Sequence, residues 1–120
     1  MKLTDQEKRD ILDSMLATIS HISDKEYQMR IWIRGEGPEV DDFDETLCHF
    51  SQDGVGVIEK YRDFGLTENQ YRILSNFRDE FERFSDNNDL PQLFIDTPEW
   101  TKITLMAKKV LEAFNYQNQG

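Results

Sequence analysis

Helix-start signals recur along this chain, each followed by apolar residues at three- and four-residue spacing. Thr4 with Glu7 and Thr67 with Gln70 form capping boxes, in which each side chain can bond the other residue's backbone N–H. This spacing puts apolar side chains on one face of an α-helix, whereas a half-buried strand requires strict alternation. The pattern therefore predicts several amphipathic helices. Their apolar faces are Ile11, Leu12, Met15, Leu16, Ile19 and Ile22 in the first, Tyr71, Leu74, Phe77, Phe81 and Phe84 in one reaching about Ser85, and Trp100, Ile103, Met106, Ala107, Val110, Leu111 and Phe114 in the last.

The segment Tyr27 to Arg34 is open to two interpretations. As a strand it would show Tyr27, Met29, Ile31 and Ile33 on one face. As a helix it would follow a capping box made by Ser23 and Glu26 and stop at Gly35. We favour the helix, because a lone strand needs a partner for its backbone hydrogen bonds and no other segment alternates convincingly.

The middle of the chain predicts a loop and two helices. Gly35 to Val40 lacks apolar periodicity and favours turns. Asp41 or Asp42 can cap the next helix, Gln52 to Gly54 predicts a break, and Gly65 has the expected position for the end of a short second helix. The apolar residues of these two helices are Phe43, Leu47 and Phe50, and then Val55, Ile58, Tyr61 and Phe64.

Near the end, Asp86 to Asp96 predicts a polar connector whose apolar stretch, Leu93 to Ile95, plugs the end of the bundle. Thr97 caps the last helix, and Pro98 suits the first helical position, where its missing N–H has no cost. At 120 residues the chain has the usual size of one domain. We therefore expect an all-α fold, a single-domain bundle of five or six helices that spans residues 1–120.

Negative charge is concentrated in one part of the chain. From Gly35 to Ile58 there are seven carboxylates and no Lys or Arg, within a chain of formal net charge −10. Such a field repels nucleic acid and anionic membranes and attracts a basic protein surface. The seven residues are Glu36, Glu39, Asp41, Asp42, Asp44, Glu45 and Asp53.

Several chemical functions find no support in the residues. The acidic segment lacks the ligand spacing of a calcium loop, and the single cysteine, Cys48, gives no zinc-ligand spacing with His21 or His49. Neighbouring helical residues point about 100° apart, so Cys48 and His49 do not suit a nucleophile and base. We expect no cofactor, no metal and no enzymatic activity. The region from Met1 to Glu7 does not resemble a signal peptide, which makes the cytoplasm the expected compartment.

Two interpretations of the acidic segment stay open. The carboxylates can cap a helix and keep the protein soluble. They can also form a docking surface for a basic protein, with Trp32 as an aromatic anchor beside them. We expect His21, Tyr27 and Trp100 at the margins of the core, because each has an apolar body and a polar tip. The candidate partner-binding residues are Trp32, Glu36, Glu39, Asp41, Asp42, Asp44, Glu45 and Asp53.

Three segments resemble bacterial immunity proteins of polymorphic toxin and contact-dependent growth inhibition systems. They are Trp32 to Glu45 (WIRGEGPEVDDFDE), Phe77 to Phe81 (FRDEF) and Phe94 to Trp100 (FIDTPEW). The resemblance implies a cytoplasmic, non-enzymatic inhibitor that binds a cognate toxin domain, often a basic nuclease. It transfers no catalytic residue. The alternative function is a small helical scaffold or regulatory subunit that associates through apolar surface.

Overall fold

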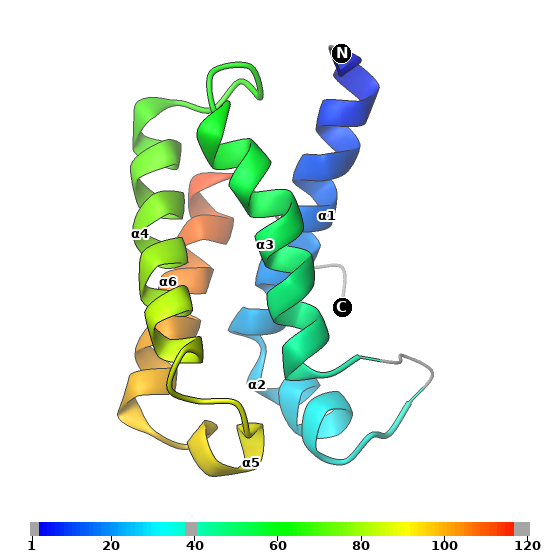
Figure 1. Ribbon diagram of the computed structural model, residues 1–120, viewed down its shortest axis with the longest axis vertical. Coiled ribbons are helices and arrows are strands. Elements are labelled where there is room, and N and C mark those ends of the chain that lie inside the picture. The colour runs from blue at the N-terminus through cyan, green and yellow to red at the C-terminus, as the bar shows by residue number, and fades with distance from the viewer. Residues whose placement is uncertain (1–2, 38–40, 117–120) are drawn as a thin grey trace.

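The computed structural model describes residues 3–37 and 41–116 and shows the expected all-α architecture (Figure 1). Four long helices run alternately down and up the molecule. Three short helices, α2, η1 and α5, lie together at one end, which is the lower end in Figure 1. The elements are α1 (Asp5–Ser23), α2 (Lys25–Tyr27), the π-helix η1 (Gln28–Ile33), α3 (Phe43–Glu59), α4 (Glu68–Ser85), α5 (Pro91–Phe94) and α6 (Pro98–Ala113).

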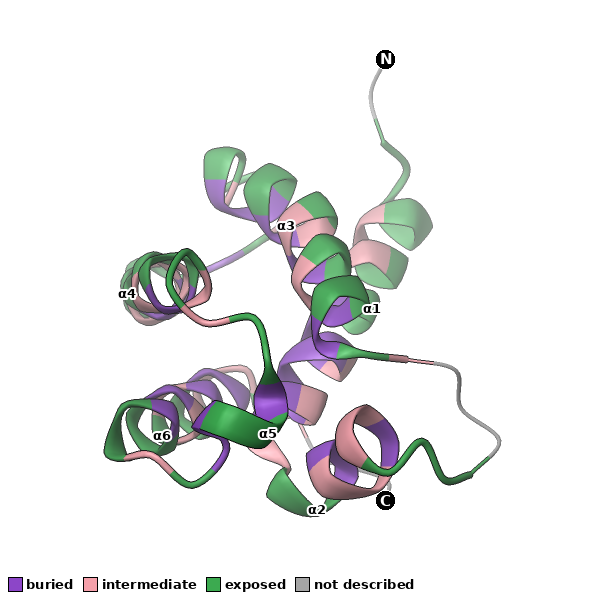
Figure 2. Ribbon diagram, turned by 60° about the horizontal axis from the view of Figure 1, so that its bottom comes forward, coloured by how far each residue is buried: buried purple, intermediate pink, exposed green. Residues whose placement is uncertain are grey.

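The long helices form a closed ring of neighbours. Helix α1 packs against α3 and α6, and α4 packs against the same two helices from the other side. Each helix turns its buried residues toward the centre and its exposed residues outward, as Figure 2 shows. This is the packing that helices with one apolar face adopt when the connections between them are short. The prediction of an all-α bundle is confirmed.

The predicted caps at three of the long helices are present. Thr4 Oγ1 accepts from the Glu7 N–H at 3.1 Å, and Thr67 Oγ1 accepts from the Gln70 N–H at 3.1 Å. Thr97 Oγ1 accepts from the Trp100 N–H at 3.2 Å. These bonds satisfy N–H groups that a helix leaves unpaired in its first turn.

The capping box predicted at Ser23 and Glu26 is wrong, because the chain begins its next helix one residue later. Asp24 is the cap, and its carboxylate accepts from the Tyr27 N–H at 3.1 Å. Ser23 Oγ instead donates to the Ser20 carbonyl at 2.7 Å. A hydroxyl at the end of one helix bonds back to that helix as readily as it caps the next one.

Residues 27–33 are helical and Arg34 is the C-terminal cap, which confirms the choice of helix over strand. Six of them form a π-helix, in which the Arg34 N–H reaches back five residues to the Met29 carbonyl at 3.1 Å. Gly35 then takes a φ of +64°, a left-handed conformation that glycine adopts without steric cost. The wider turn of a π-helix was not predicted from the sequence, and such turns are frequent at functional sites.

The predicted break at Gln52 to Gly54 is wrong, because α3 continues without interruption to Glu59. Phe50 and Val57, which flank the expected break, are both buried in the core. A Cβ at position 54 would lie 3.3 Å from the Phe50 ring, so glycine here lets that ring pack against the helix. Tertiary packing thus outweighs the weak helix propensity of the glycines, and the chain turns only at Lys60 to Gly65.

The expectation that Trp100 lies at the margin of the core is also wrong. Its side chain is only 1% exposed, and the centroids of Phe94 and Phe84 lie 4.8 and 5.2 Å from that of its ring. Its indole N–H donates to Gln28 Oε1 at 2.9 Å inside the core. An internal acceptor therefore allows the largest side chain to be buried completely.

The expected plug at Leu93 to Ile95 is confirmed for two of its residues. Phe94 and Ile95 are buried at the lower end of the bundle, whereas Leu93 is 73% exposed. None of the described helices has the length and apolar character needed to cross a membrane.

Candidate functional site

The first turn of α3 presents three carboxylates at the lower end of the molecule. Asp42 is the cap, and its Oδ1 accepts from the Glu45 N–H at 2.8 Å. Asp44 and Glu45 are exposed, and neither forms an ion pair with the described part of the chain. The positive end of the helix dipole favours negative charge here. We call Asp42, Asp44 and Glu45 the acidic start of α3.

Asp41, one residue earlier, belongs to the interior. Its Oδ2 accepts from Tyr27 Oη at 2.8 Å and from Trp32 Nε1 at 3.3 Å. Thr46 Oγ1 lies 3.0 Å from the same oxygen. Donors from α2, η1 and α3 thus converge on one half-buried carboxylate. Asp41 ties these elements together, and its carboxylate is occupied within the fold.

Trp32 is packed inward, so the expectation of an aromatic anchor on the surface is not supported by its position. Its ring centroid lies 5.6 Å from that of Phe43 and 6.1 Å from that of Trp100. Its N–H is bonded to Asp41. The half-buried ring joins η1 to the core and supports the loop that follows it.

The other predicted residues occupy three different settings. Glu36 is exposed, and its Oε2 lies 3.8 Å from Arg34 Nε. Asp53 is half-buried and accepts from Ser14 Oγ at 2.7 Å, which links α3 to α1. Glu39 lies outside the described residues. The structure therefore gathers only part of the predicted set, namely Asp42, Asp44 and Glu45, into one outward-facing group.

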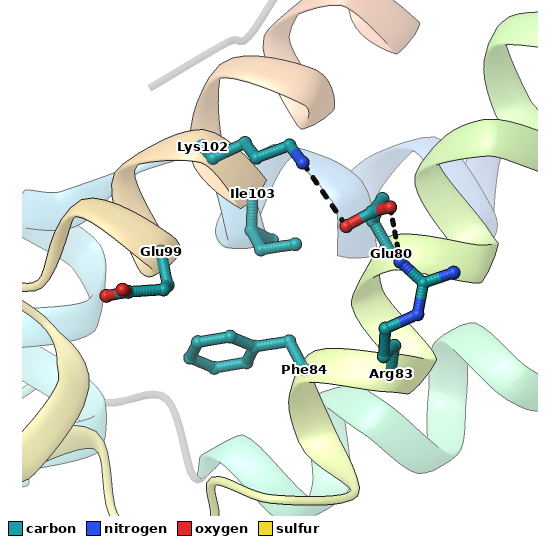
Figure 3. Close-up of a pocket in the computed structure, with 6 residues that line it drawn as sticks. All are labelled: Glu80, Arg83, Phe84, Glu99, Lys102 and Ile103. Carbon is teal, nitrogen blue, oxygen red and sulfur yellow. Dashed lines mark hydrogen bonds and ion pairs between the residues drawn. The ribbon is translucent and has the colours of Figure 1, made fainter.

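A groove between α4 and α6, with a volume of about 200 Å³, is a second candidate (Figure 3). Arg83 Nη1 lies 2.6 Å from Glu80 Oε1, and Lys102 Nζ lies 3.5 Å from Glu80 Oε2. The hydrogen bond from Arg83, aided by the charges of Arg83 and Lys102, holds the pKa of Glu80 below its usual value. The groove is lined by Glu80, Arg83, Phe84, Glu99, Lys102 and Ile103.

Sequence analysis missed this groove. The spacing of Glu80 and Arg83 predicts a pair on one helix face. The contact with Lys102, however, depends on the way α4 packs against α6. A lowered pKa keeps the Glu80 carboxylate ionised, which is the opposite of what a general acid requires. The groove thus combines an ion-pair network around Glu80 with the edge of the core, where Phe84 and Ile103 are only 9% and 1% exposed.

Among the described residues, no group of three or more His, Cys, Asp or Glu side chains is arranged to hold a metal ion. Cys48 is exposed on α3. Shallow hollows at the turn between α3 and α4 adjoin Tyr61 and Tyr71, whose rings stack with centroids 4.1 Å apart.

Comparison with known proteins gave no match to a protein-family model, a curated protein or a solved structure.

Proposed function

We propose that this protein is a non-enzymatic inhibitor that binds a basic protein partner through the acidic start of α3. The partner we propose is a cognate bacterial toxin domain, which makes the chain a cytoplasmic immunity protein. The observation that carries the proposal is the exposed first turn of α3, where Asp44 and Glu45 have no ion pair with the described chain.

Electrostatics supports a basic partner. The segment from Gly35 to Ile58 has seven carboxylates and no Lys or Arg, and the whole chain has a formal net charge of −10. A field of this sign increases the rate at which a cationic surface finds the protein. When the complex forms, carboxylates that are desolvated beside Arg or Lys of the partner form charge-assisted hydrogen bonds, which slow dissociation.

The rigidity of the surface also supports binding. Asp42 caps α3. Asp41, the residue before that cap, accepts hydrogen bonds from Tyr27 and Trp32. The backbone that presents Asp44 and Glu45 is therefore fixed by contacts on both sides. A surface that is already ordered loses less conformational entropy when a partner binds.

The choice of a toxin as the partner comes from the resemblance of Trp32 to Glu45 and of two shorter segments to immunity proteins. A nuclease that binds its substrate in a cationic groove would present a surface to which an acidic one is complementary. If the adjacent upstream reading frame ends in a toxin domain, its product is the partner to be tested.

The test compares two double variants with the same change in charge. D44N/E45Q removes two carboxylates from the first turn of α3, and D63N/E112Q removes two exposed carboxylates, one in the turn between α3 and α4 and one in the last turn of α6. Titration calorimetry with the product of the adjacent reading frame should show at least about tenfold weaker binding for D44N/E45Q, with a smaller salt dependence. D63N/E112Q should bind within about twofold of the parent. Equal affinities for the two variants would refute the proposed surface.

The alternative is association through apolar surface, and one observation favours it. Leu90 and Leu93, just before and within α5, are 46% and 73% exposed. If these leucines form the interface, binding should show a large negative heat-capacity change and little dependence on salt. In that case L90S/L93S would weaken the complex while D44N/E45Q would leave it unchanged.

A further inference from the structure

We infer that two exposed leucines at α5 and the acidic start of α3 form one surface, and that this surface binds a basic protein segment with apolar side chains between its cations. Leu90, just before α5, and Leu93, within it, are 46% and 73% exposed. The inference rests on the proposed function, because it uses the same acidic residues, and it adds an apolar centre to that interface. Charge docking and apolar association are then two parts of one contact.

The fold brings α5 against the start of α3. Phe43, the first residue of α3, packs against Phe94 of α5, with ring centroids 5.0 Å apart. Asp44 follows Phe43 in the chain and Leu93 precedes Phe94, so an exposed carboxylate and an exposed leucine adjoin this buried contact. Both elements are at the lower end of Figure 1, the end that comes forward in Figure 2.

The two leucines are held on the surface by their neighbours in the chain. Pro91 and Phe94 are buried, and the Ile95 N–H closes the turn of α5 on the Pro91 carbonyl at 2.9 Å. The proline ring also restricts the backbone between the leucines. Apolar side chains that are already fixed lose little conformational entropy on binding and gain free energy by leaving water. Leu90 and Leu93 thus suit the centre of an interface.

The leucines lie within a second segment that has no cations. From Phe84 to Thr101 there are four carboxylates and no Lys or Arg. Asp86 and Asp89, which precede Leu90, are exposed and form no ion pair within the described chain. Carboxylates therefore reach the leucines from two segments, the start of α3 and the connector before α5. The four carboxylates of the second segment are Asp86, Asp89, Asp96 and Glu99.

The cations of α2 and η1, at the same end of the bundle, are already engaged. Lys25 Nζ lies 2.6 Å from Asp96 Oδ1. Arg30 and Arg34 both contact Glu36, through its carbonyl oxygen at 3.5 Å and its carboxylate at 3.8 Å respectively. These contacts leave the acidic start of α3 and the carboxylates just before α5 without compensating charge.

This charge decides which occupant fits the leucines. A second copy of the chain would bring like charges together around the apolar centre, and an anionic membrane would be repelled in the same way. A basic segment can place an apolar side chain against the leucines while its Lys or Arg residues meet the carboxylates beside them. Interfaces often have an apolar centre and a polar rim, and the exclusion of water strengthens charge pairs at the edge of that centre.

The experiment uses the full chain and synthetic peptides, so it does not require the toxin. The peptide KLAKKLAKKLAK has leucines at helical spacing between lysines. KSAKKSAKKSAK keeps the charge without the leucines, and QLAQQLAQQLAQ keeps the leucines without the charge. In titrations of the ¹⁵N-labelled protein, KLAKKLAKKLAK should shift the amides of Leu93 and Asp44 together and bind at least about fivefold more tightly than either control peptide.

Variants then identify the leucine responsible. L93S should weaken binding of KLAKKLAKKLAK about fivefold or more. L105S, which removes a leucine that is 54% exposed on α6, is the matched control and should bind within about twofold of the parent. L93W enlarges the exposed apolar side chain and should strengthen binding about twofold, a gain that misfolding cannot produce.

Equal binding of KLAKKLAKKLAK and KSAKKSAKKSAK, or equal effects of L93S and L105S, would overturn the inference. Titration with the toxin separates it from the proposed function. If D44N/E45Q weakens toxin binding and L93S does not, the acidic docking surface stands and the apolar centre is refuted. If L93S weakens toxin binding and D44N/E45Q does not, the proposed function is refuted, and the single surface with it. Weaker toxin binding in both variants supports the two together.

Discussion

Two sets of polar side chains lie at the lower end of the bundle in opposite environments. Gln28 is fully buried, and its amide accepts from Trp100 and donates to the carbonyls of His21 and Ile22 at 2.9 Å each. Asp44 and Glu45, at the start of α3, are exposed to solvent and form no ion pair with the described chain. The first set has all its partners within the fold, and the second has its charge available to another molecule.

The difference shows how residues 28–45 supply polar groups both for the interior of the fold and for the surface. A buried polar group without a partner is strongly unfavourable, so Gln28 and Asp41 have several donors or acceptors around them. An exposed carboxylate is solvated by water and needs no partner for stability. Residues of the first kind should therefore determine stability, and residues of the second kind should determine binding.

The largest expected effect is at Gln28. Gln28→Leu keeps the volume of the side chain but leaves the Trp100 N–H and the carbonyls of His21 and Ile22 without their partner. We expect a loss of about 3 kcal/mol in the free energy of unfolding, measured with urea. Trp100→Phe should cost less in the Gln28→Leu background than alone, because the two residues share a bond. Additive losses would show that this buried bond contributes little.

Asp41 and Asp44 provide the most direct contrast between the two sets. Asp41→Ala removes the acceptor of Tyr27 and Trp32 and should cost about 2 kcal/mol. Asp44→Ala should change the unfolding free energy by no more than about 0.5 kcal/mol. Thermal and urea unfolding measure both. Similar values for the two variants would remove the distinction between an interior and an exterior carboxylate.

A smaller effect, of opposite sign, is expected at Gly56. A Cβ at this position of α3 meets no atom within 4 Å, so Gly56→Ala should stabilise the protein by about 0.5–1 kcal/mol. Gly54→Ala should gain less, since its Cβ would lie 3.3 Å from the Phe50 ring. Differential scanning calorimetry compares the two. A larger gain at Gly54 would mean that the ring of Phe50 moves freely, contrary to its burial.

The smallest effect concerns pH. Since the pKa of Glu80 is lowered in the folded state, its stabilising contribution is present at neutral pH and is lost as the pH falls below the normal carboxyl range. The difference in unfolding free energy between the parent and Glu80→Gln should therefore shrink between about pH 7 and about pH 3. The effect is expected to be slight because Arg83 and Lys102 are solvated. A difference that grows on acidification would contradict the lowered pKa.

Local signals were sufficient to predict α1, α4 and α6 and the starts of all four long helices. Thr4, Thr67 and Thr97 cap as expected because a cap involves residues only three positions apart. The acidic start of α3 was predicted for the same reason. Asp42 and its neighbours follow a loop-forming segment and precede apolar residues with helical spacing.

Tertiary structure decided what depends on distant parts of the chain. Helix α3 continues through Gly54 because Phe50 and Val57 are buried against other helices, a stabilisation that local propensity does not include. Trp100 is buried because Gln28, 72 residues away, accepts its N–H. The sequence by itself thus determined that the chain is helical, where most helices start, and that the segment around the start of α3 is acidic. Packing determined which polar groups face inward, because the cost of burying them depends on partners that only the folded chain brings together.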